Sequence, residues 1–299
     1  MTTKRNVMVC ICTYKRPLLL KRLLNKLADQ DTKGLFAYSI IVVDNDASRS
    51  SEAVVAQAAH TTNVPLKYCV EANRGIAHAR NRALEDAKTD FIAFIDDDEF
   101  PTKEWLLNLF ETCDKYQVDG VLGPVKRHFD EEPPKWIRRG KFFIRPSHPT
   151  GFIMNWPETR TGNVLFKRSV LPADSPAFRS EFRSGSDVDF FKRMMAKGHV
   201  FIWCDEAVVY ETVPPARWQR SYILRKGLQR GQSAALRRDG VRGIIKSLIA
   251  VPVYIFALPF ILALGQHRFM MVLMKICDHL GKLLALIGVN PIKDIYVTE

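Results

Sequence analysis

Short, uninterrupted apolar runs alternate with amphipathic stretches in the first hundred residues. The apolar runs are Val7–Cys12, Ile40–Val43 and Phe91–Ile95. Continuous runs of this length predict strands that are buried on both faces of a parallel sheet. Between these runs, the spacing of apolar positions predicts helices at Pro17–Gln30, Ser51–His60 and Gly75–Ala87. This order of elements predicts an α/β fold, with a Rossmann-like, mostly parallel sheet flanked by helices.

Each of the three predicted strands runs into a polar residue. Thr13 follows the first strand, Asp44 the second and Asp96 the third. Ligands of open α/β sheets bind beyond the carboxyl ends of the strands. We therefore expect a hydroxyl group and several carboxylates at one edge of the sheet, and a ligand site beside them.

The middle of the chain has a less regular pattern. Residues Gly120–Pro157 include Pro133-Pro134 and two tryptophans, which indicates a loop-rich acceptor or lid region. A strand is predicted at Thr161–Phe166 and a helix at Asp187–Lys197. Two short apolar segments follow, at Val200–Trp203 and Ala207–Tyr210.

Composition changes after Pro214-Pro215. The stretch Arg217–Lys246 contains nine basic residues against one acid, Asp239. We therefore predict two domains: residues 1–214, and a basic and apolar helical segment, residues 215–299, that associates with a membrane. Basic residues next to a membrane segment attract anionic lipid and favour the cytoplasmic side.

The segment Ser247–Leu264 carries no charge. As a straight helix it would be about 27 Å long, slightly less than the hydrocarbon thickness of a bilayer. Pro252 and Pro259 would kink such a helix. A kinked or re-entrant helix, or a hairpin with residues 269–289, fits this pattern better than a simple span. A buried helix of a soluble core is the alternative.

The overall charge is strongly positive, with 44 basic and 32 acidic residues and a net charge of +12. Such an excess attracts nucleic acid, anionic lipid or phosphorylated substrates. The basic residues concentrate beside an apolar segment and no nucleic-acid motif is recognisable, so we expect no nucleic-acid partner. The six cysteines have no metal-ligand spacing, and the polar N-terminus lacks the apolar core of a signal peptide. We therefore expect a reducing compartment.

Four adjacent acids, Asp96-Asp97-Asp98-Glu99, follow the third strand. Their mutual repulsion is costly unless a positive group is bound. Carboxylates at a strand end suit a hard divalent cation, Mg²⁺ or Mn²⁺, which prefers oxygen ligands and substrate phosphates. The alternative is a solvated acidic turn that caps the helix predicted near Thr102.

Two helix starts carry further candidates. Gly75 precedes a helix with Arg74, Arg80 and Arg82 nearby, and the N–H groups of a helix start favour an anion. A helix cap with surface arginines is the alternative. Asp187 and Asp189 begin a later helix, where either carboxylate can cap the helix, act as a general base, or do both.

These motifs, in this order, resemble family 2 glycosyltransferases of the GT-A fold, and most closely the bacterial succinoglycan-type exopolysaccharide enzymes. The resemblance covers residues 6 to 215. Six motifs carry it: residues 9–17 (VCICTYKRP), 42–45 (VVDN), 75–81 (GIAHARN), 96–98 (DDD), 161–163 (TGN) and 186–189 (SDVD).

The resemblance implies an inverting glycosyltransferase that uses a nucleotide-sugar, commonly a UDP-sugar, and Mg²⁺ or Mn²⁺. It implies that Thr13 and Asp44 hold the nucleobase and that Arg80 faces the diphosphate. Asp96 and Asp97 belong to the donor site, with Asp96 near the ribose. The implied metal ligand is Asp98, the implied base is Asp187, and Thr161, Gly162 and Asn163 shape the acceptor side.

The chain departs from the family pattern at two positions. Ser186 stands where a glutamate often precedes the base, so Asp189 is the alternative base. Glu211 stands where many relatives have a metal-binding histidine, and it either replaces that ligand or pairs with an arginine. A nucleotide-sugar-binding protein without activity is therefore an alternative function. We expect a lipid-linked saccharide acceptor and a site at the cytoplasmic face of a bacterial plasma membrane.

Overall fold

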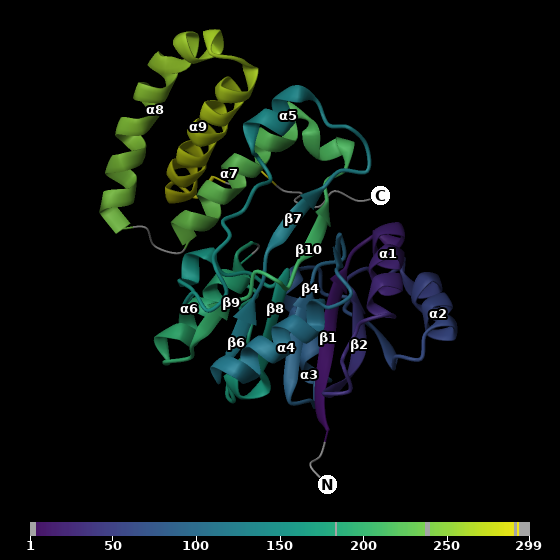
Figure 1. Ribbon diagram of the computed structural model, residues 1–299. Helices are drawn as coiled ribbons and strands as arrows, with labels where there is room; N and C mark the ends of the chain where they lie inside the picture. Colours follow the sequence, from purple (N-terminus) through teal and green to yellow (C-terminus); the bar gives the residue numbers. More distant parts are fainter. Residues whose placement is uncertain (1–3, 183, 237–239, 290–291, 293–299) are drawn as a thin grey trace. The chain divides into compact units, whose positions relative to one another are not determined.

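The computed structural model describes residues 4–182, 184–236, 240–289 and 292. Their contacts divide the chain into two compact units, and Figure 1 shows their elements. The first unit comprises residues up to Lys126 and Arg145–Glu211. The second comprises Arg127–Ile144 and Thr212–Val297. The C-terminal part of the second unit thus begins at Thr212, three residues before the boundary expected at residue 215. The second unit also includes residues 127–144, which the sequence had placed in the first domain.

A seven-stranded sheet forms the centre of the first unit, in the order β3-β2-β1-β4-β8-β6-β9. Strands β3, β2, β1 and β4 are parallel, whereas β8 is antiparallel to both β4 and β6. This confirms the predicted α/β fold with a mostly parallel sheet. The strands are β1 (Arg5–Thr13), β2 (Phe36–Asp44), β3 (Leu66–Val70), β4 (Phe91–Ile95), β6 (Gly120–Leu122), β8 (Asn163–Lys167) and β9 (Phe201–Trp203).

Both faces of this sheet are covered by helices, because alternate residues of β1 and β2 are buried in two different clusters. Val9 and Ile40 belong to one cluster with apolar residues of α1, α2 and α4. Cys10 and Ile41 belong to the other, with residues of α3 and α6. The helices are α1 (Pro17–Leu27), α2 (Glu52–Thr61), α3 (Ile76–Glu85), α4 (Trp105–Tyr116) and α6 (Ser186–Ala196).

A second, three-stranded sheet has the order β5-β10-β7. It consists of β5 (Glu99–Pro101), β10 (Val209–Thr212) and β7 (Val125–His128). Strands β5 and β10 are antiparallel, and their register sets Glu211 opposite Glu99. Two like charges face each other directly across this pair, which is destabilising unless a positive group lies between them.

The second unit is helical. Its helices are α5 (Lys135–Gly140), α7 (Arg220–Leu236), α8 (Gly240–Ala263) and α9 (Gln266–Leu286). Helices α8 and α9 form a hairpin at Gly265, whose φ of 111° favours glycine. Helix α9 lies within three residues of the expected start and end of the second arm of such a hairpin, residues 269–289. Within the described residues, Gly243–Ala263 is the helix that is long and apolar enough to cross a membrane.

Helices α7 and α9 pack at close range because glycines face the partner backbone. A Cβ atom added at Gly227 would lie 2.7 Å from the carbonyl oxygen of Met274, and one at Gly231 would overlap the carbonyl of Asp278. In the reverse direction, a Cβ at Gly281 would overlap the backbone of Leu228. Glycine spacing of this kind lets two helices approach until their backbones touch.

Candidate active site

Three neighbouring parallel strands bring the predicted donor residues to one edge of the sheet. Thr13 ends β1 and Asp44 ends β2, and the two are paired in the ladder between these strands. Asp96 follows β4, which lies on the other side of β1. The arrangement follows from parallel pairing, because the carboxyl ends of parallel strands lie at the same edge.

Asp44 is fully buried and is held by three hydrogen bonds. Its carboxylate accepts from the backbone N–H groups of Ser51, at 2.8 Å, and Asp46, at 3.1 Å, and from the Tyr68 hydroxyl at 2.9 Å. Burial, and then the hydrogen bond to Asp44, raise the pKa of Tyr68. The carboxylate is therefore fixed in orientation, as a nucleobase contact requires.

The side chain of Asn45 fixes the loop that leads into α3. Its amide donates to the carbonyls of Glu71 and Asn73, both at 2.8 Å, and its oxygen accepts from the Gly75 N–H at 2.8 Å. Gly75 has a φ of 147°, a conformation that side chains disfavour. Helix α3, with Arg80, is positioned in this way.

Arg80 connects α3 to the start of α6. Its guanidinium is buried and donates to the Ser186 hydroxyl at 3.2 Å. Ser186, one of the departures from the family pattern, is fully buried and serves as this acceptor. The charge of Arg80 also lowers the pKa of Asp96, against the larger effect of burial.

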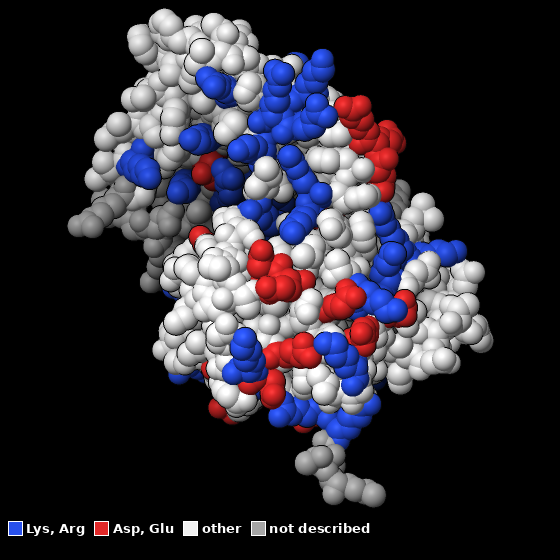
Figure 2. Space-filling model, in the orientation of Figure 1, with Lys and Arg blue, Asp and Glu red and all other residues white. Residues whose placement is uncertain are grey.

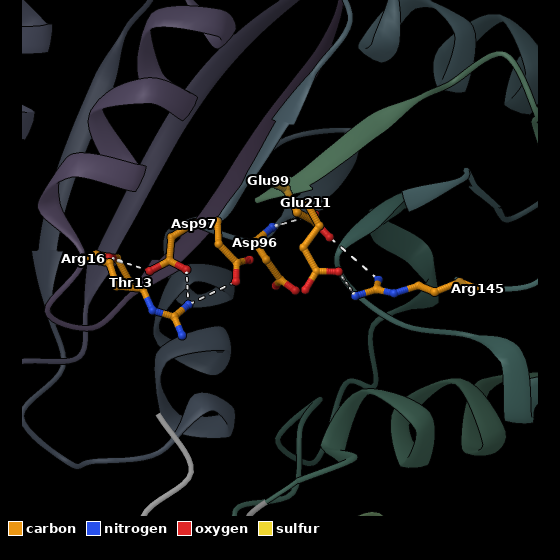
Figure 3. Close-up of polar contacts among 8 residues, drawn as sticks. Thr13, Arg16, Asp96, Asp97, Glu99, Arg145 and Glu211 are labelled. Carbon is orange, nitrogen blue, oxygen red and sulfur yellow. Dashed lines mark hydrogen bonds and ion pairs between the residues drawn. The ribbon is translucent and has the colours of Figure 1, made fainter. Parts of the chain in front are cut away.

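Arg16 and Thr13 hold the second and third acids of the cluster (Figure 3). The Thr13 hydroxyl donates to Asp97 at 2.9 Å, and Arg16 donates to Asp97 at 2.9 Å and to Asp98 at 3.4 Å. Arg16 lies within the first motif, but the sequence analysis assigned it no role. Thr13, expected at the nucleobase, therefore also supports the acidic run.

Burial and mutual repulsion disfavour the charged forms of the acids in this cluster. Burial raises the pKa of Asp96, Asp97 and Glu99, and repulsion from neighbouring acids raises them further. The pKa of Asp97 rises to about 6 although Arg16 opposes the shift. The Oε1 atom of Glu99 is buried and has no hydrogen-bond partner among the described residues.

The turn before β8 packs directly against these acids. A Cβ atom on Gly162 would lie 2.6 Å from Glu99 Oε1 and 3.1 Å from Asp96 Oδ2. Thr161 is buried beside it, and its hydroxyl has no partner among the described residues. Gly162 therefore adjoins the carboxylates rather than an open acceptor surface.

Asn163 has a different position from the one the sequence predicted. Its buried side chain accepts from Trp105 Nε1 at 2.8 Å and donates to the carbonyls of Pro124, at 3.0 Å, and Ala207, at 2.7 Å. These three bonds occupy the carboxamide and tie α4 to two loops. The sequence placed this side chain on the acceptor side. In the structure its bonds go to protein groups instead, and Asn163 positions the turn that contains Gly162.

Arg145 supplies the positive group between the facing glutamates of β5 and β10. Its guanidinium lies 2.5 Å from Glu211 and 3.8 Å from Glu99 (Figure 3). The sequence analysis left open whether Glu211 pairs with an arginine, and Arg145 is that arginine. Arg145 also lines a cavity. Its other lining residues include His148, Glu158, Arg160 and Trp203.

Arg160 is a second positive residue that the sequence analysis missed. Burial lowers its pKa, as does the charge of Arg145, whereas the Asp187 carboxylate raises it. Neither arginine belongs to a recognised motif, and both lie in an irregular part of the chain. Their place in the site emerges only from the folded structure.

The structure distinguishes the two candidate bases at the start of α6. Asp189 is buried and pairs with Arg193 at 2.8 Å and with Arg179 at 3.7 Å. Asp187 is half-buried and its carboxylate accepts from the N–H of Val188 at 2.9 Å. It also lies close enough to Asp96 to raise the pKa of that carboxyl. Of the two aspartates, Asp187 is thus the one without an arginine ion pair among the described residues, and it lies close enough to Asp96 to act on it electrostatically.

The cluster fits a divalent cation that completes its coordination with substrate. The described residues contain no group of three or more histidine, cysteine or acidic side chains able to hold a metal by themselves. Mg²⁺ and Mn²⁺ at nucleotide sites need only one or two carboxylates, with phosphate and water oxygens as the remaining ligands. Glu99 Oε1 has no hydrogen-bond donor among the described residues, and Arg145 is its cationic neighbour at 3.8 Å. Burial, and then neighbouring acids, raise the carboxyl pKa values, and a bound cation would lower them again. Asp98 and Glu211 remain the predicted ligands.

Replacing Gly162 by alanine is expected to disrupt the acidic cluster. The new Cβ would overlap Glu99 Oε1, whose carboxyl group is buried and has no space into which to move. Overpacking of this kind lowers the free energy of unfolding by about 1–3 kcal/mol. We expect a lower melting temperature together with weaker donor binding. Gly198→Ala is the comparison for donor binding: nothing lies within 4 Å of a Cβ there, but its φ of 95° strains any side chain, so it should lower the melting temperature without weakening donor binding.

The raised pKa of Asp97 predicts a pH dependence of stability in the metal-free protein. The folded state holds this proton more tightly than the unfolded chain, where an aspartate has a pKa of about 3.9. The free energy of unfolding should therefore fall as the pH rises from about 4 to about 6. Thermal melts in EDTA across this window test it, and Asp97→Asn should flatten the curve. A wild-type stability that rises through this window would contradict the prediction.

A mostly parallel α/β sheet with carboxylates at the ends of neighbouring strands is the arrangement of the GT-A fold, and the comparisons with known proteins show the family. The sequence profile of glycosyl transferase family 2 matches residues 8–177. The chain is 33% identical to the succinoglycan biosynthesis protein ExoM of Rhizobium meliloti over 241 residues, which cover 78% of this chain and 76% of ExoM. This chain belongs to family 2 and is a glycosyltransferase.

More distant similarities show the same fold. Poly(ribitol-phosphate) β-N-acetylglucosaminyltransferase TarS of Staphylococcus aureus is 23% identical over 214 residues, which cover 68% of this chain and 35% of TarS. The crystal structure of TarS residues 1–349 with UDP aligns with a TM-score of 0.55 at 19% identity, over 97% of this chain and 94% of that one. The mannosyltransferase PcManGT of Pyrobaculum calidifontis, in complex with GDP-Man and Mn²⁺, aligns with a TM-score of 0.65 at 18% identity, over 94% and 88%.

Proposed function

We propose that this glycosyltransferase transfers its sugar by a single displacement that inverts the anomeric centre. The observation that carries the proposal is the difference between the two aspartates of α6. Asp189 is buried and paired with Arg193 and Arg179, whereas Asp187 is half-buried and close enough to Asp96 to raise the pKa of that carboxyl. One carboxylate is then available to act as the base.

In the proposed reaction, Asp187 accepts the proton of the acceptor hydroxyl as its oxygen forms a bond to the anomeric carbon. The bond from that carbon to the nucleotide diphosphate breaks, and the electron pair leaves with the diphosphate. In this proposal, Arg80 offsets charge on the leaving group. Arg145 and Arg160 orient the acceptor side and exclude competing water.

The donor in this proposal is a UDP-sugar, and the reaction depends on Mg²⁺ or Mn²⁺. TarS bound to UDP-GlcNAc and PcManGT bound to GDP-Man and Mn²⁺ support a nucleotide-sugar and a divalent metal. When bound, the metal supplies Lewis-acid stabilisation of the departing diphosphate. Asp98 and Glu211 would hold it, Asp96 and Asp97 would flank the donor, and Thr13 and Asp44 would hold the nucleobase.

The acceptor in this proposal is a lipid-linked saccharide at the cytoplasmic face of a bacterial plasma membrane. The similarity to a succinoglycan biosynthesis protein supports a growing polysaccharide as the acceptor class. The basic second unit favours a phosphorylated, membrane-held substrate.

A calorimetric titration of the full chain with UDP, GDP and CDP, with and without Mn²⁺, tests the donor. We expect metal-dependent binding of UDP. Incubation with the matching UDP-sugars and lipid-linked saccharides then tests transfer, and NMR coupling constants of the product report the anomeric configuration. A product with the configuration of the donor would refute inversion, and binding without turnover on any acceptor would refute the enzyme reaction proposed here.

A further inference from the structure

The positive charge of this protein belongs entirely to its second unit. Residues 127–144 and 212–297 contain 18 lysines and arginines and 6 aspartates and glutamates, a net charge of +12 that equals the charge of the whole chain. The first unit is therefore balanced. Figure 2 shows lysines and arginines gathering on the surface over α5 and α7, with a white surface over α8.

Helix α8 presents a continuous apolar stripe on the side that faces away from α9. Its exposed residues recur every three or four positions, which places them on one face of a helix. Phe256 is 77% exposed and Phe260 is 67% exposed, although aromatic residues of this size are usually buried. The stripe consists of Pro252, Pro259 and eight large apolar residues. The eight are Ile245, Leu248, Ile249, Val253, Ile255, Phe256, Phe260 and Leu262.

The opposite face of α8 is attached to α9. The hydroxyl of Ser247 and Nδ1 of His279 lie 2.9 Å apart in a buried hydrogen bond. One to two turns further along α8, the ring of Tyr254 lies 6.0 Å from the His279 ring and 5.8 Å from the ammonium of Lys275. Helix α8 therefore has a polar, α9-facing side and an apolar, unpartnered side.

Helix α9 is in turn bound to α7 and carries charges along its length. Arg230 of α7 pairs with Asp278 at 3.1 Å, and the glycine contacts at Gly231 and Gly281 bring the two backbones together. A spanning α8 would carry Lys275, Asp278 and Lys282 of α9 into the hydrocarbon. Charges at that depth are costly and are tolerated only where a bundle interior or water surrounds them.

We propose that α8 lies flat in the headgroup and acyl boundary of a single anionic membrane leaflet, without crossing the bilayer. The stripe inserts among the acyl chains, α9 stays on the aqueous side, and the lysines and arginines of the second unit contact anionic headgroups. A second copy of the chain is a poor occupant of this stripe, because two units of charge +12 repel each other. This inference concerns how the protein is held at the membrane and does not depend on the reaction proposed for the first unit.

The docking surface is tested by flotation of the full chain with vesicles that contain phosphatidylglycerol. The triple variant Ile249→Ser, Phe256→Ser, Phe260→Ser should lower the partition coefficient about a hundredfold, because each change removes inserted apolar area. The matched control replaces three exposed apolar residues of the first unit: Leu35→Ser, Ile153→Ser, Val200→Ser. The control should float like the wild type. Equal flotation of the stripe variant would overturn the proposal.

UDP titration of the same preparations separates this inference from the proposed reaction. Unchanged donor binding with lost flotation supports membrane docking by the stripe. If the wild type fails to float and instead forms a dimer that the stripe changes abolish, the occupant is a second copy and the inference is wrong. Flotation of the wild type without any nucleotide binding would leave docking intact and contradict only the donor site.

Single cysteines distinguish a flat helix from a span. Lys246 lies beside the first residue of the stripe and Arg268 follows the last, and both are exposed. In a background with Cys12→Ser and Cys277→Ser, the variants Lys246→Cys and Arg268→Cys are bound to preformed vesicles and treated with a membrane-impermeant maleimide. A flat α8 leaves both positions equally labelled in intact vesicles. Labelling of one position only after detergent would show that α8 crosses the bilayer.

Discussion

Replacing Asp187 by asparagine is expected to lower kcat about a thousandfold while the affinity for the donor nucleotide stays within about twofold. A positioned general base contributes roughly 10²–10⁴ to a rate, and the asparagine keeps the shape of the side chain but cannot accept the proton. Its carboxamide oxygen can still accept from the N–H of Val188, so the start of α6 should remain intact. Steady-state kinetics and nucleotide titration of the same preparation measure both quantities.

Asp189→Asn is the matched control for this experiment. Asp189 has paired arginines on both sides, so its loss should lower the melting temperature and leave kcat within a fewfold of wild type. The reverse pattern, with kcat lost in Asp189→Asn and retained in Asp187→Asn, would transfer the base to Asp189. Equal kcat in both variants and the wild type would exclude both aspartates.

The central strands were predictable because burial on both faces leaves a clear signal in the sequence. Phe91–Ile95 forms β4 with the expected bounds, and β1 and β2 extend only a few residues beyond theirs. Strand β3 was missed because Leu66–Val70 lies at the edge of the sheet and alternates, with Lys67 exposed. Edge strands lack the continuous apolar run on which the prediction depends.

The donor side of the site was predictable from strand ends, but the acceptor side was not. One rule was enough to predict the positions of Thr13, Asp44 and Asp96: ligands bind at the carboxyl ends of parallel strands. The role of Arg145 could be predicted only from the register of β5 and β10. This register sets two glutamates opposite each other, and such a pair requires a nearby cation. No local pattern encodes a pairing between strands that are about a hundred residues apart.

The same limit applies to Asn163 and to the second unit. A Thr-Gly-Asn turn beside the site suggested three substrate contacts, but Trp105 and two distant carbonyls occupy the Asn163 side chain. Likewise, residues 127–144 join the C-terminal helices through α5, which packs on α9. Both outcomes depend on tertiary contacts that override what neighbouring residues suggest.

The metal assignment makes the second large prediction. Asp98→Ala should abolish metal-dependent donor binding, raising the Kd for UDP in Mn²⁺ at least about a hundredfold, which corresponds to about 2.7 kcal/mol. Asp98 is the buried third member of the acidic run, and its carboxylate lies 3.4 Å from Arg16. Without it, the proposed metal loses a ligand and Arg16 loses its contact with this carboxylate.

Two controls isolate the metal. Asp29→Ala removes an exposed carboxylate of the first unit, paired only at 3.5 Å with Lys103, and should leave the Kd unchanged. UDP binding in EDTA should be equally weak in the wild type and in Asp98→Ala, because the lost affinity is the part that the metal supplies. If Asp98→Ala binds UDP in Mn²⁺ as the wild type does, Asp98 is not a metal ligand. In that case, a cationic group of the substrate or of the protein itself would have to balance the negative charge of these carboxylates.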